Sequence, residues 1–296
     1  MLLNTIRQVL DQKPCPDEIL VIDQTPKHEE ETCKTLSRWH ACGDIRWILQ
    51  TESSLTQARN RAVLETDAEI IAFLDDDALI KDDWLASHTR HYAIPEVSAV
   101  VGQLYWRIDD FSQLDPYHPT RGTVVSFNTV GVRRVDFLVG CNFSVRREHL
   151  IRARGFDQAF KGAANYEEGD FAYRLIKSGG VILLDSDAYI IHLQYPSGGC
   201  RSSGHPNFVG WTKSYNYFLY TFRHLKGKKQ FLKVFNQAMR IPFSGTHRSP
   251  GRWPECFLTL VRAFTKALIQ ASRPPQSPWS TKTMSFNQTS VRAKKN

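Results

Sequence analysis

The sequence predicts an α/β fold followed by a helical C-terminal extension, and two observations support this prediction. Short apolar runs typical of buried strands alternate with stretches of helical apolar spacing over the first two thirds of the chain. Beyond residue 205 the strand pattern stops, and two amphipathic stripes of helical period follow. A chain of 296 residues is long enough for one large domain or two small ones.

The first elements are marked by their apolar spacing and by the residues that interrupt it. Leu2, Ile6 and Leu10 have helical spacing, and Pro14 and Pro16 end that helix. The pattern then predicts a strand over 18–22, a helix over 29–40, a strand over 44–49, a helix over 54–64 and a strand over 69–74. This alternation favours a parallel, doubly wound sheet, in which ligands bind at the carboxyl ends of the strands.

The middle of the chain continues the alternation less regularly. The pattern predicts helices over 147–153 and 166–177, and Gly179-Gly180 end the second of them. It predicts strands over 99–101, 135–139, 181–184 and 188–191.

The last third of the chain has a different character. Its two apolar stripes consist of Trp211, Tyr215, Phe218, Leu219, Phe222 and Leu225, and of Phe257, Leu260, Val261, Phe264 and Leu268. The final residues are rich in Pro, Ser, Thr and Lys, which is typical of a disordered tail. We therefore expect an α/β domain over 1–205, a basic amphipathic helical extension over 206–272 and a disordered basic tail over 273–296.

Charge is distributed unevenly along the chain. Residues 201–296 carry 17 Lys and Arg and one acidic residue, Glu255, whereas the whole chain has a net charge of +8. An acidic body with a basic C-terminal third favours contact with a polyanion, either a membrane surface or nucleic acid. No nucleic-acid-binding motif is recognised, which disfavours the second reading.

Cysteine usage and hydropathy bear on the compartment. The six cysteines are widely spread and form no CxxC pair, which is typical of reduced thiols in a cytosolic protein. No signal peptide and no apolar stretch of transmembrane length is recognised. We therefore predict a cytoplasmic protein.

Three consecutive carboxylates, Asp75-Asp76-Asp77, follow the apolar strand over 69–74. Like charges this close are costly unless a cation neutralises them. Asp75 and Asp77 point the same way if the strand geometry continues, and Mg²⁺ or Mn²⁺ suits such a pair. The alternative is a solvated acidic turn or helix start, as Asp82-Asp83 looks to be.

Six short motifs, in this order and at this spacing, resemble family 2 of the glycosyltransferases over about residues 1–205. They are Asp23, Ala58-Arg-Asn-Arg-Ala62, Phe73-Leu-Asp-Asp-Asp77, Gly140-Cys-Asn-Phe-Ser-Val-Arg-Arg147, Gly155-Phe-Asp157 and Glu167-Glu-Gly-Asp-Phe-Ala-Tyr-Arg-Leu175. The resemblance implies a GT-A fold, which is a Rossmann-like mixed sheet. It also implies metal-dependent transfer of a sugar from a nucleoside-diphosphate sugar to an acceptor hydroxyl.

The resemblance assigns roles around the donor. Asp23 is expected to contact the nucleobase or ribose, and Arg59 to lie beside the nucleotide. Asp75 and Asp77 match the DxD pair, with Asp77 as the direct metal ligand. Asp76 and Asn142 are also expected to bind the nucleotide sugar.

The remaining roles fall later in the chain. Glu168 matches the general base, and Glu167 either shares that role or is a charge favoured by the helix N-terminus. His192 matches a late histidine that joins the metal and diphosphate, and the alternative is a histidine satisfied by the protein itself. Arg201, in a glycine-containing loop, is expected to cover the diphosphate.

The implied mechanism is an inverting displacement, in which the base removes the acceptor proton. UDP- or dTDP-sugars are the donors that the resemblance favours. A sugar or lipid-linked acceptor is expected, in cell-surface polysaccharide or glycolipid synthesis. The basic helices either contact the anionic inner face of the membrane peripherally or pack on the catalytic domain.

One departure from the family bears on activity. Members begin with an apolar strand that supports the nucleobase, whereas Met1-Leu-Leu-Asn-Thr-Ile6 matches the helix that follows it. The first strand is therefore expected to be missing. The alternative function is a truncated, catalytically inactive member that acts as a binding protein or remnant.

Overall fold

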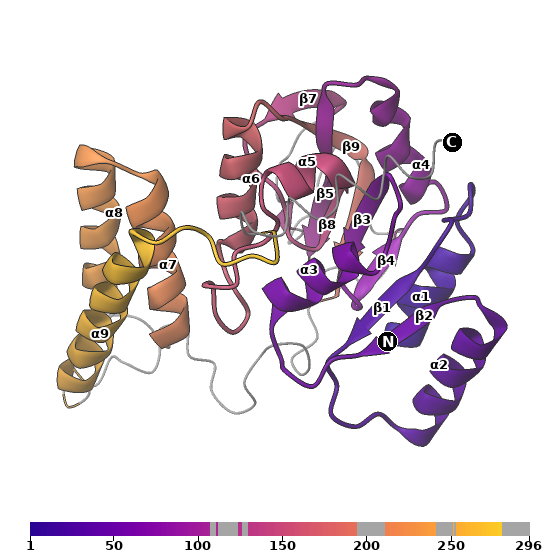
Figure 1. Ribbon diagram of the computed structural model, residues 1–296, viewed down its shortest axis with the longest axis horizontal. Helices are drawn as coiled ribbons and strands as arrows, with labels where there is room; N and C mark the ends of the chain where they lie inside the picture. The colour runs from indigo at the N-terminus through magenta and orange to yellow at the C-terminus, as the bar shows by residue number, and fades with distance from the viewer. Residues whose placement is uncertain are drawn as a thin grey trace. The chain divides into compact units, whose positions relative to one another are not determined.

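The structure is a computed structural model that describes residues 1–106, 111, 124–125, 130–193, 211–240, 251 and 253–279 (Figure 1). The chain divides into two compact units. Unit 1 comprises residues 1–52, 61–153 and 174–198, and unit 2 comprises residues 53–60, 154–173 and 199–296. The division falls within two helices, α3 (Leu55–Leu64) and α6 (Glu167–Lys177).

Unit 1 contains two sheets. A parallel pair is formed by β1 (Leu20–Asp23) and β2 (Arg46–Leu49). The second sheet has the strand order β3-β8-β5-β9-β4, with β6 paired to β5 and β7 paired to β9. Its strands are β3 (Ile70–Leu74), β4 (Ala78–Ile80), β5 (Val97–Trp106), β6 (Val124–Val125), β7 (Val132–Val135), β8 (Asn142–Arg146) and β9 (Val181–His192).

The seven-stranded sheet is mixed, as the resemblance implies, and this corrects the parallel sheet expected from the strand–helix alternation. Among the described residues of this sheet, β5 and β9 pair in parallel and the other pairs are antiparallel. The alternation misled because β3 and β4 are separated by the acidic triplet alone. Three residues are too few for the helical crossover that parallel neighbours need. The triplet instead joins the two ends of the strand order.

Helices complete unit 1. They are α1 (Leu2–Leu10), α2 (Glu30–Cys42), α4 (Trp84–Thr89), the 3₁₀ helix η1 (Arg90–Ala93) and α5 (Arg147–Arg152). The predicted apolar face of α1 is buried: Ile6 packs with Leu36 and Trp39 of α2 and with Ile45. Among the described residues, β1 pairs with β2 alone and β3 with β8 alone, so the two sheets are not joined through strand pairing.

One long strand, β9, replaces the two strands predicted over 181–184 and 188–191. The residues between the two predicted strands continue the strand, and among them Asp185 is fully buried. Its carboxylate accepts hydrogen bonds from Arg90 at 2.6 Å and from His91 at 2.6 Å. Charge-assisted bonds of this kind allow a buried carboxylate that periodicity alone cannot anticipate.

Unit 2 has its core between the C-terminal helices and an earlier segment of the chain. The helices are α7 (Trp211–His224), α8 (Gly227–Arg240) and α9 (Trp253–Ala271). The first predicted stripe packs inward, because Tyr215, Phe218 and Leu219 are buried with Ala159, Phe160, Ala164, Ala263 and Ala267. In the second stripe, by contrast, Phe257 is 66% exposed. The helix α8 is an addition to the predicted elements.

The predicted tail begins too early. The backbone N–H of Gln276 donates to Asp157 Oδ1 at 2.8 Å, and Gln158 N–H donates to Gln276 O at 2.9 Å. Trp279 is buried and lies against Gly155. Residues 273–279 are therefore ordered by unit 2, which corrects the expectation of disorder there, and residues 280–296 lie outside the described part of the chain.

Within the described residues, every helix is either too short or too polar to cross a bilayer.

Candidate active site

Backbone pairing fixes both sides of the acidic triplet. Leu74, the last residue of β3, pairs with Asn142 of β8, and Ala78, the first residue of β4, pairs with His192 at the end of β9. His192 Nε2 lies 3.5 Å from Asp75 Oδ2 and 3.1 Å from Asp77 Oδ1. The structure thus brings together the three residues that the sequence predicted as metal ligands.

A cysteine that sequence reasoning missed lies at the same place. Ligand atoms of Asp75, Cys141 and His192 all lie within 4.8 Å of one another. Cys141 directly precedes β8, so it follows from the β3–β8 register that this residue neighbours Asp75. The sequence signal was present, since Cys141 belongs to the Gly140–Arg147 motif, but strand pairing was needed to interpret it.

The electrostatics of this cluster favour a cation. Burial opposes the charge on His192, but the hydrogen bonds and charges of Asp75 and Asp77 outweigh it and raise the pKa of the imidazole to about 9. His192 Nδ1 is one of the buried polar atoms of the described residues that have no hydrogen-bond partner. Two carboxylates and an imidazole that converge in this way form a donor set that fits Mg²⁺ or Mn²⁺.

The helix α1 holds the backbone of the triplet and of β4. Thr5 Oγ1 donates to Asp76 O at 2.8 Å. Gln8 Nε2 donates to Ala78 O at 3.2 Å, and Gln8 Oε1 accepts from Ile80 N at 2.9 Å. A glutamine side chain thereby replaces a neighbouring strand along β4, while the Asp76 side chain itself is exposed.

Asp23 is held by its own neighbours at the end of β1. Its carboxylate accepts hydrogen bonds from the Thr25 backbone N–H at 2.9 Å, from Trp47 Nε1 at 2.8 Å and from His28 Nε2 at 2.6 Å. Burial opposes ionisation, but these bonds outweigh it and lower the pKa of Asp23. The predicted nucleotide contact would therefore involve a carboxylate that is ionised and firmly oriented.

Arg59 and Glu167 form a buried ion pair in unit 2. The Glu167 side chain is 1% exposed, and the Arg59 guanidinium also lies 5.3 Å from the centre of the Phe156 ring. Burial raises the pKa of Glu167 to about 8, with help from the charges of Glu168 and Asp170 and against the charge of Arg59. Glu168, the second residue of α6, is half-buried.

A second buried network in unit 2 was not anticipated. Arg174, four residues after Asp170 on α6, donates to Ala153 O within unit 1. Asp170 accepts from His224 Nε2 at 2.7 Å and from Arg223, which also pairs with Asp157. The contacts from α7 could not be read from helical spacing because they span more than 50 residues of sequence.

One predicted donor-site residue, Asn142, lies in the core of unit 1. The Asn142 side chain is fully buried among protein groups, and its role in the structure is to hold the core together. This structural role replaces the predicted nucleotide contact. Arg201 and its loop lie outside the described residues.

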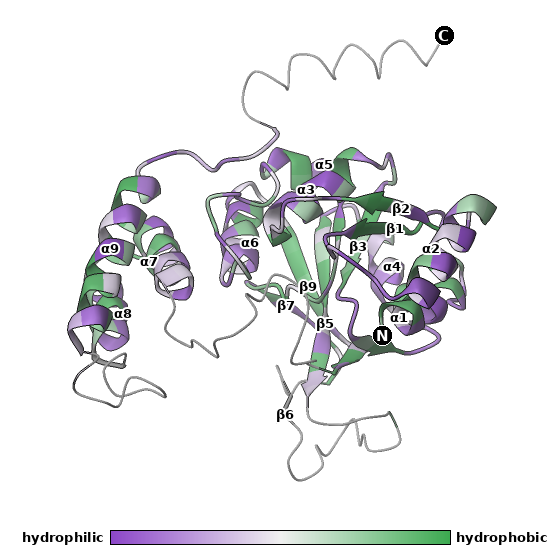
Figure 2. Ribbon diagram, turned by 90° about the horizontal axis from the view of Figure 1, so that it is seen from below, coloured by the Kyte–Doolittle hydropathy of each residue, from purple (hydrophilic) through white to green (hydrophobic). Residues whose placement is uncertain are grey.

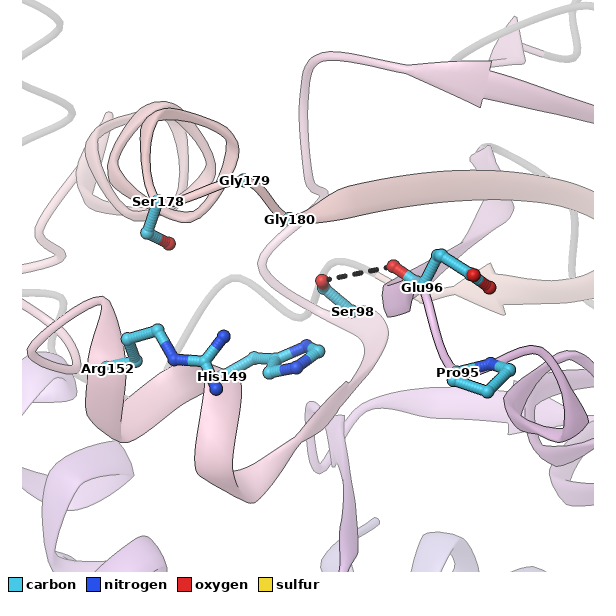
Figure 3. Close-up of a pocket in the computed structure, with 8 residues that line it drawn as sticks. All are labelled: Pro95, Glu96, Ser98, His149, Arg152, Ser178, Gly179 and Gly180. Carbon is cyan, nitrogen blue, oxygen red and sulfur yellow. Dashed lines mark hydrogen bonds between the residues drawn. The ribbon is translucent and has the colours of Figure 1, made fainter.

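One small pocket in unit 1 lies apart from the acidic cluster (Figure 3). It has a volume of about 270 Å³ and is lined by residues that include Ser98, His149 and Arg152. Ser98 and Gly180 place it at the starts of β5 and β9, whereas His192 ends β9. The pocket is therefore at the opposite end of the sheet from the candidate cation site, and we assign it no part in donor binding.

Comparisons with known structures agree on the class. The mannosyltransferase PcManGT of Pyrobaculum calidifontis, solved with GDP-Man and Mn²⁺, matches at 18% identity and a TM-score of 0.50, over 99% of this chain and 77% of that one. TarS of S. aureus, solved with UDP-GlcNAc, matches at 16% identity and a TM-score of 0.58. The match covers 92% of this chain and 78% of TarS. GalNAc-T7, solved with UDP, GalNAc and Mn²⁺, matches at 17% identity and a TM-score of 0.52. The match covers 81% of this chain and 51% of GalNAc-T7.

These likenesses, with the mixed sheet and the carboxylates at the end of β3, define a protein of the GT-A glycosyltransferase fold. The family model named glycosyl transferase family 2 matches residues 1–153. The chain belongs to that family, and it is a glycosyltransferase that uses a nucleotide sugar. No curated protein sequence matches it significantly.

Proposed function

We propose that this glycosyltransferase transfers a sugar with inversion from a UDP- or dTDP-sugar to a sugar or lipid-linked hydroxyl, in cell-surface polysaccharide or glycolipid synthesis. The observation that carries the proposal is the convergence of Asp75, Asp77 and His192 at backbone-fixed positions. In a member of this family, such a donor set supports a cation that binds the donor diphosphate.

Asp75, Asp77 and His192 would hold the Mg²⁺ or Mn²⁺. A bound cation of this kind would stabilise the negative charge of the departing nucleoside diphosphate. Asp23, ionised and fixed by three hydrogen bonds, is proposed to orient the nucleotide.

Glu168 is proposed as the general base that accepts the proton of the acceptor hydroxyl. Glu167 is less suited to that role because its carboxylate is buried in the ion pair with Arg59. The Arg59–Glu167 pair is proposed to fix the start of α6, from which Glu168 projects.

The donor site can be tested with a thermal-shift panel. UDP, dTDP, GDP and CMP would each be added with and without Mn²⁺ to the wild type, Asp77→Ala and Asp82→Ala. We expect a Mn²⁺-dependent rise in Tm with UDP or dTDP that Asp77→Ala abolishes. Asp82→Ala, which removes an exposed aspartate from the next acidic turn, should keep it.

The base can be tested separately. Glu168→Gln should keep the nucleotide-dependent rise but lose about 100-fold or more of the transfer rate, as expected when a general base is removed. No rise with any nucleotide, from a wild-type chain that unfolds cooperatively, would reject the proposed donor site and favour an inactive family member.

A further inference from the structure

The thiol of Cys141 adds a ligand type to the candidate cation site that the proposed function does not use. Its Sγ, an Asp75 carboxylate oxygen and an imidazole nitrogen of His192 lie within 4.8 Å of one another. They come from three segments: the end of β3, the residue before β8 and the end of β9.

The separation of the Asp75 and His192 ligand atoms fits a tetrahedral cation. With metal–ligand distances near those of zinc, two ligands of such an ion lie about 3.3 to 3.6 Å apart. Asp75 Oδ2 and His192 Nε2 are 3.5 Å apart. Three protein ligands also leave one position for a water molecule or a phosphate oxygen, as in zinc sites that bind a substrate.

Two of the three proposed ligands are buried, and the Asp75 side chain is 41% exposed. Cys141 and His192 are each 8% exposed. His192 Nε2 is the nitrogen that faces Asp75 and Asp77, while Nδ1 is buried without a hydrogen-bond partner among the described residues. The strand pairs Leu74–Asn142 and Ala78–His192 hold the backbone next to all three ligands.

Sulfur changes which cation such a site prefers. Mg²⁺ and Mn²⁺ favour oxygen ligands, whereas Zn²⁺ and Cd²⁺ bind thiolates strongly. We propose that Asp75, Cys141 and His192 form a Zn²⁺ site, in which the Cys141 thiol releases its proton to solvent as the sulfur–metal bond forms. Competition of Zn²⁺ with the proposed Mg²⁺ or Mn²⁺ rests on the proposed function, but the Zn²⁺ site itself does not.

The test uses Cd²⁺ as a spectroscopic substitute for Zn²⁺, without nucleotide. The full chain would carry serine at the other cysteines that Cd²⁺ can reach or whose position is not described, Cys15, Cys33, Cys42 and Cys200. Titration should produce a sulfur-to-metal charge-transfer band in the near ultraviolet. Cys141→Ser should remove the band and weaken Cd²⁺ binding about tenfold or more. Cys256→Ser, which changes the other buried cysteine, should leave both unchanged.

A second measurement needs no substitution at Cys141. Zn²⁺ should slow alkylation of Cys141, followed by peptide mass spectrometry, while the alkylation rate of Cys256 stays constant. An unchanged band in Cys141→Ser, or equal alkylation of Cys141 with and without Zn²⁺, would overturn the proposal. Because nucleotide is absent throughout, these results are independent of the Mn²⁺-dependent nucleotide shift that tests the proposed function.

Discussion

At the scale of single residues, Asn142 shows how a motif residue can serve the core. Its Oδ1 accepts hydrogen bonds from Trp84 Nε1 at 2.9 Å and from His88 Nε2 at 3.0 Å. Its Nδ2 donates to Gln103 O at 3.1 Å and to Ala188 O at 2.8 Å. Both donor hydrogens and both acceptor positions are therefore used, and the amide ties α4, β5 and β9 to the start of β8.

This network requires an uncharged His88. The ring donates from Nε2 to Asn142, and its Nδ1 lies 3.1 Å from Ser144 Oγ. Burial lowers the pKa of His88 to about 4, from an ordinary value of 6.5. As the pH falls below 6.5, His88 is protonated in the unfolded chain but stays neutral in the folded chain. The free energy of unfolding therefore decreases between pH 6.5 and about pH 4.

We therefore predict an acid-dependent loss of stability that His88 dominates. The shift corresponds to roughly 3 kcal/mol of unfolding free energy between neutral pH and pH 4. Tm measured across that range should fall less steeply in His88→Gln than in the wild type, even if the variant starts from a lower value. The exposed His40→Gln serves as the control. Parallel pH profiles for the wild type and His88→Gln would contradict the prediction.

At the scale of elements, α1 is a clamp on the strand that follows the acidic triplet. Thr5 and Gln8 of α1, together with Gln12 just beyond its C-terminal end, bond through their side chains to backbone groups between Asp76 and Leu85. Gln8 and Gln12 each use both the amide and the carbonyl of the side chain. These bonds satisfy backbone groups that would otherwise be left unpaired beside the candidate cation site.

Gln8→Ala should therefore weaken both stability and cation binding. Ile80 N loses its side-chain partner, which we expect to cost about 1–3 kcal/mol, whereas Ala78 O retains Thr5 Oγ1 at 3.2 Å. Urea unfolding gives the free energy, and a Mn²⁺ titration gives the affinity. Asn4→Ala, an exposed change on the same helix, should alter neither. If Gln8→Ala and Asn4→Ala had the same free energy of unfolding and the same Mn²⁺ affinity, the proposed role of α1 would be contradicted.

At the scale of the whole molecule, the C-terminal helices leave an apolar and basic surface in water. On α8, Phe231 is 67% exposed and Phe235 is 49% exposed. Exposed lysines, Lys228, Lys229 and Lys233, lie along the same helix. Figure 2 shows hydrophobic residues along both α8 and α9. We propose that this surface contacts an anionic membrane peripherally, since aromatic and basic side chains together favour the lipid interface.

Liposome pelleting tests this surface. The chain should bind vesicles containing phosphatidylglycerol more strongly than vesicles of phosphatidylcholine, and added salt should reduce the binding. The double substitution Phe231→Ser and Phe257→Ser should reduce vesicle binding further, because it removes apolar side chains that would be buried in the lipid. Leu64→Ser, at an exposed apolar position outside these helices, is the matched control. Equal pelleting with both lipids at low salt would reject the membrane contact.

The sequence by itself determined the local elements and the family. Apolar period placed α1, α2, α3 and β3 within a few residues, because each of these elements buries one regular face or run. The resemblance to family 2 predicted that the acidic triplet and His192 act together, and the structure places His192 Nε2 3.1 Å from Asp77 Oδ1.

Only the tertiary structure decided which strands pair and which polar groups meet. Several features of the structure join residues that are far apart in the chain. They are the mixed sheet, the neighbouring positions of Cys141 and Asp75, the four hydrogen bonds of Asn142 and the pairing of Asp170 with α7. Periodicity reports how much of a segment is buried but not against what it is buried. Hydrogen bonds and ion pairs in the core depend on that partner, and so the chemistry of the site emerged only when the strands were paired.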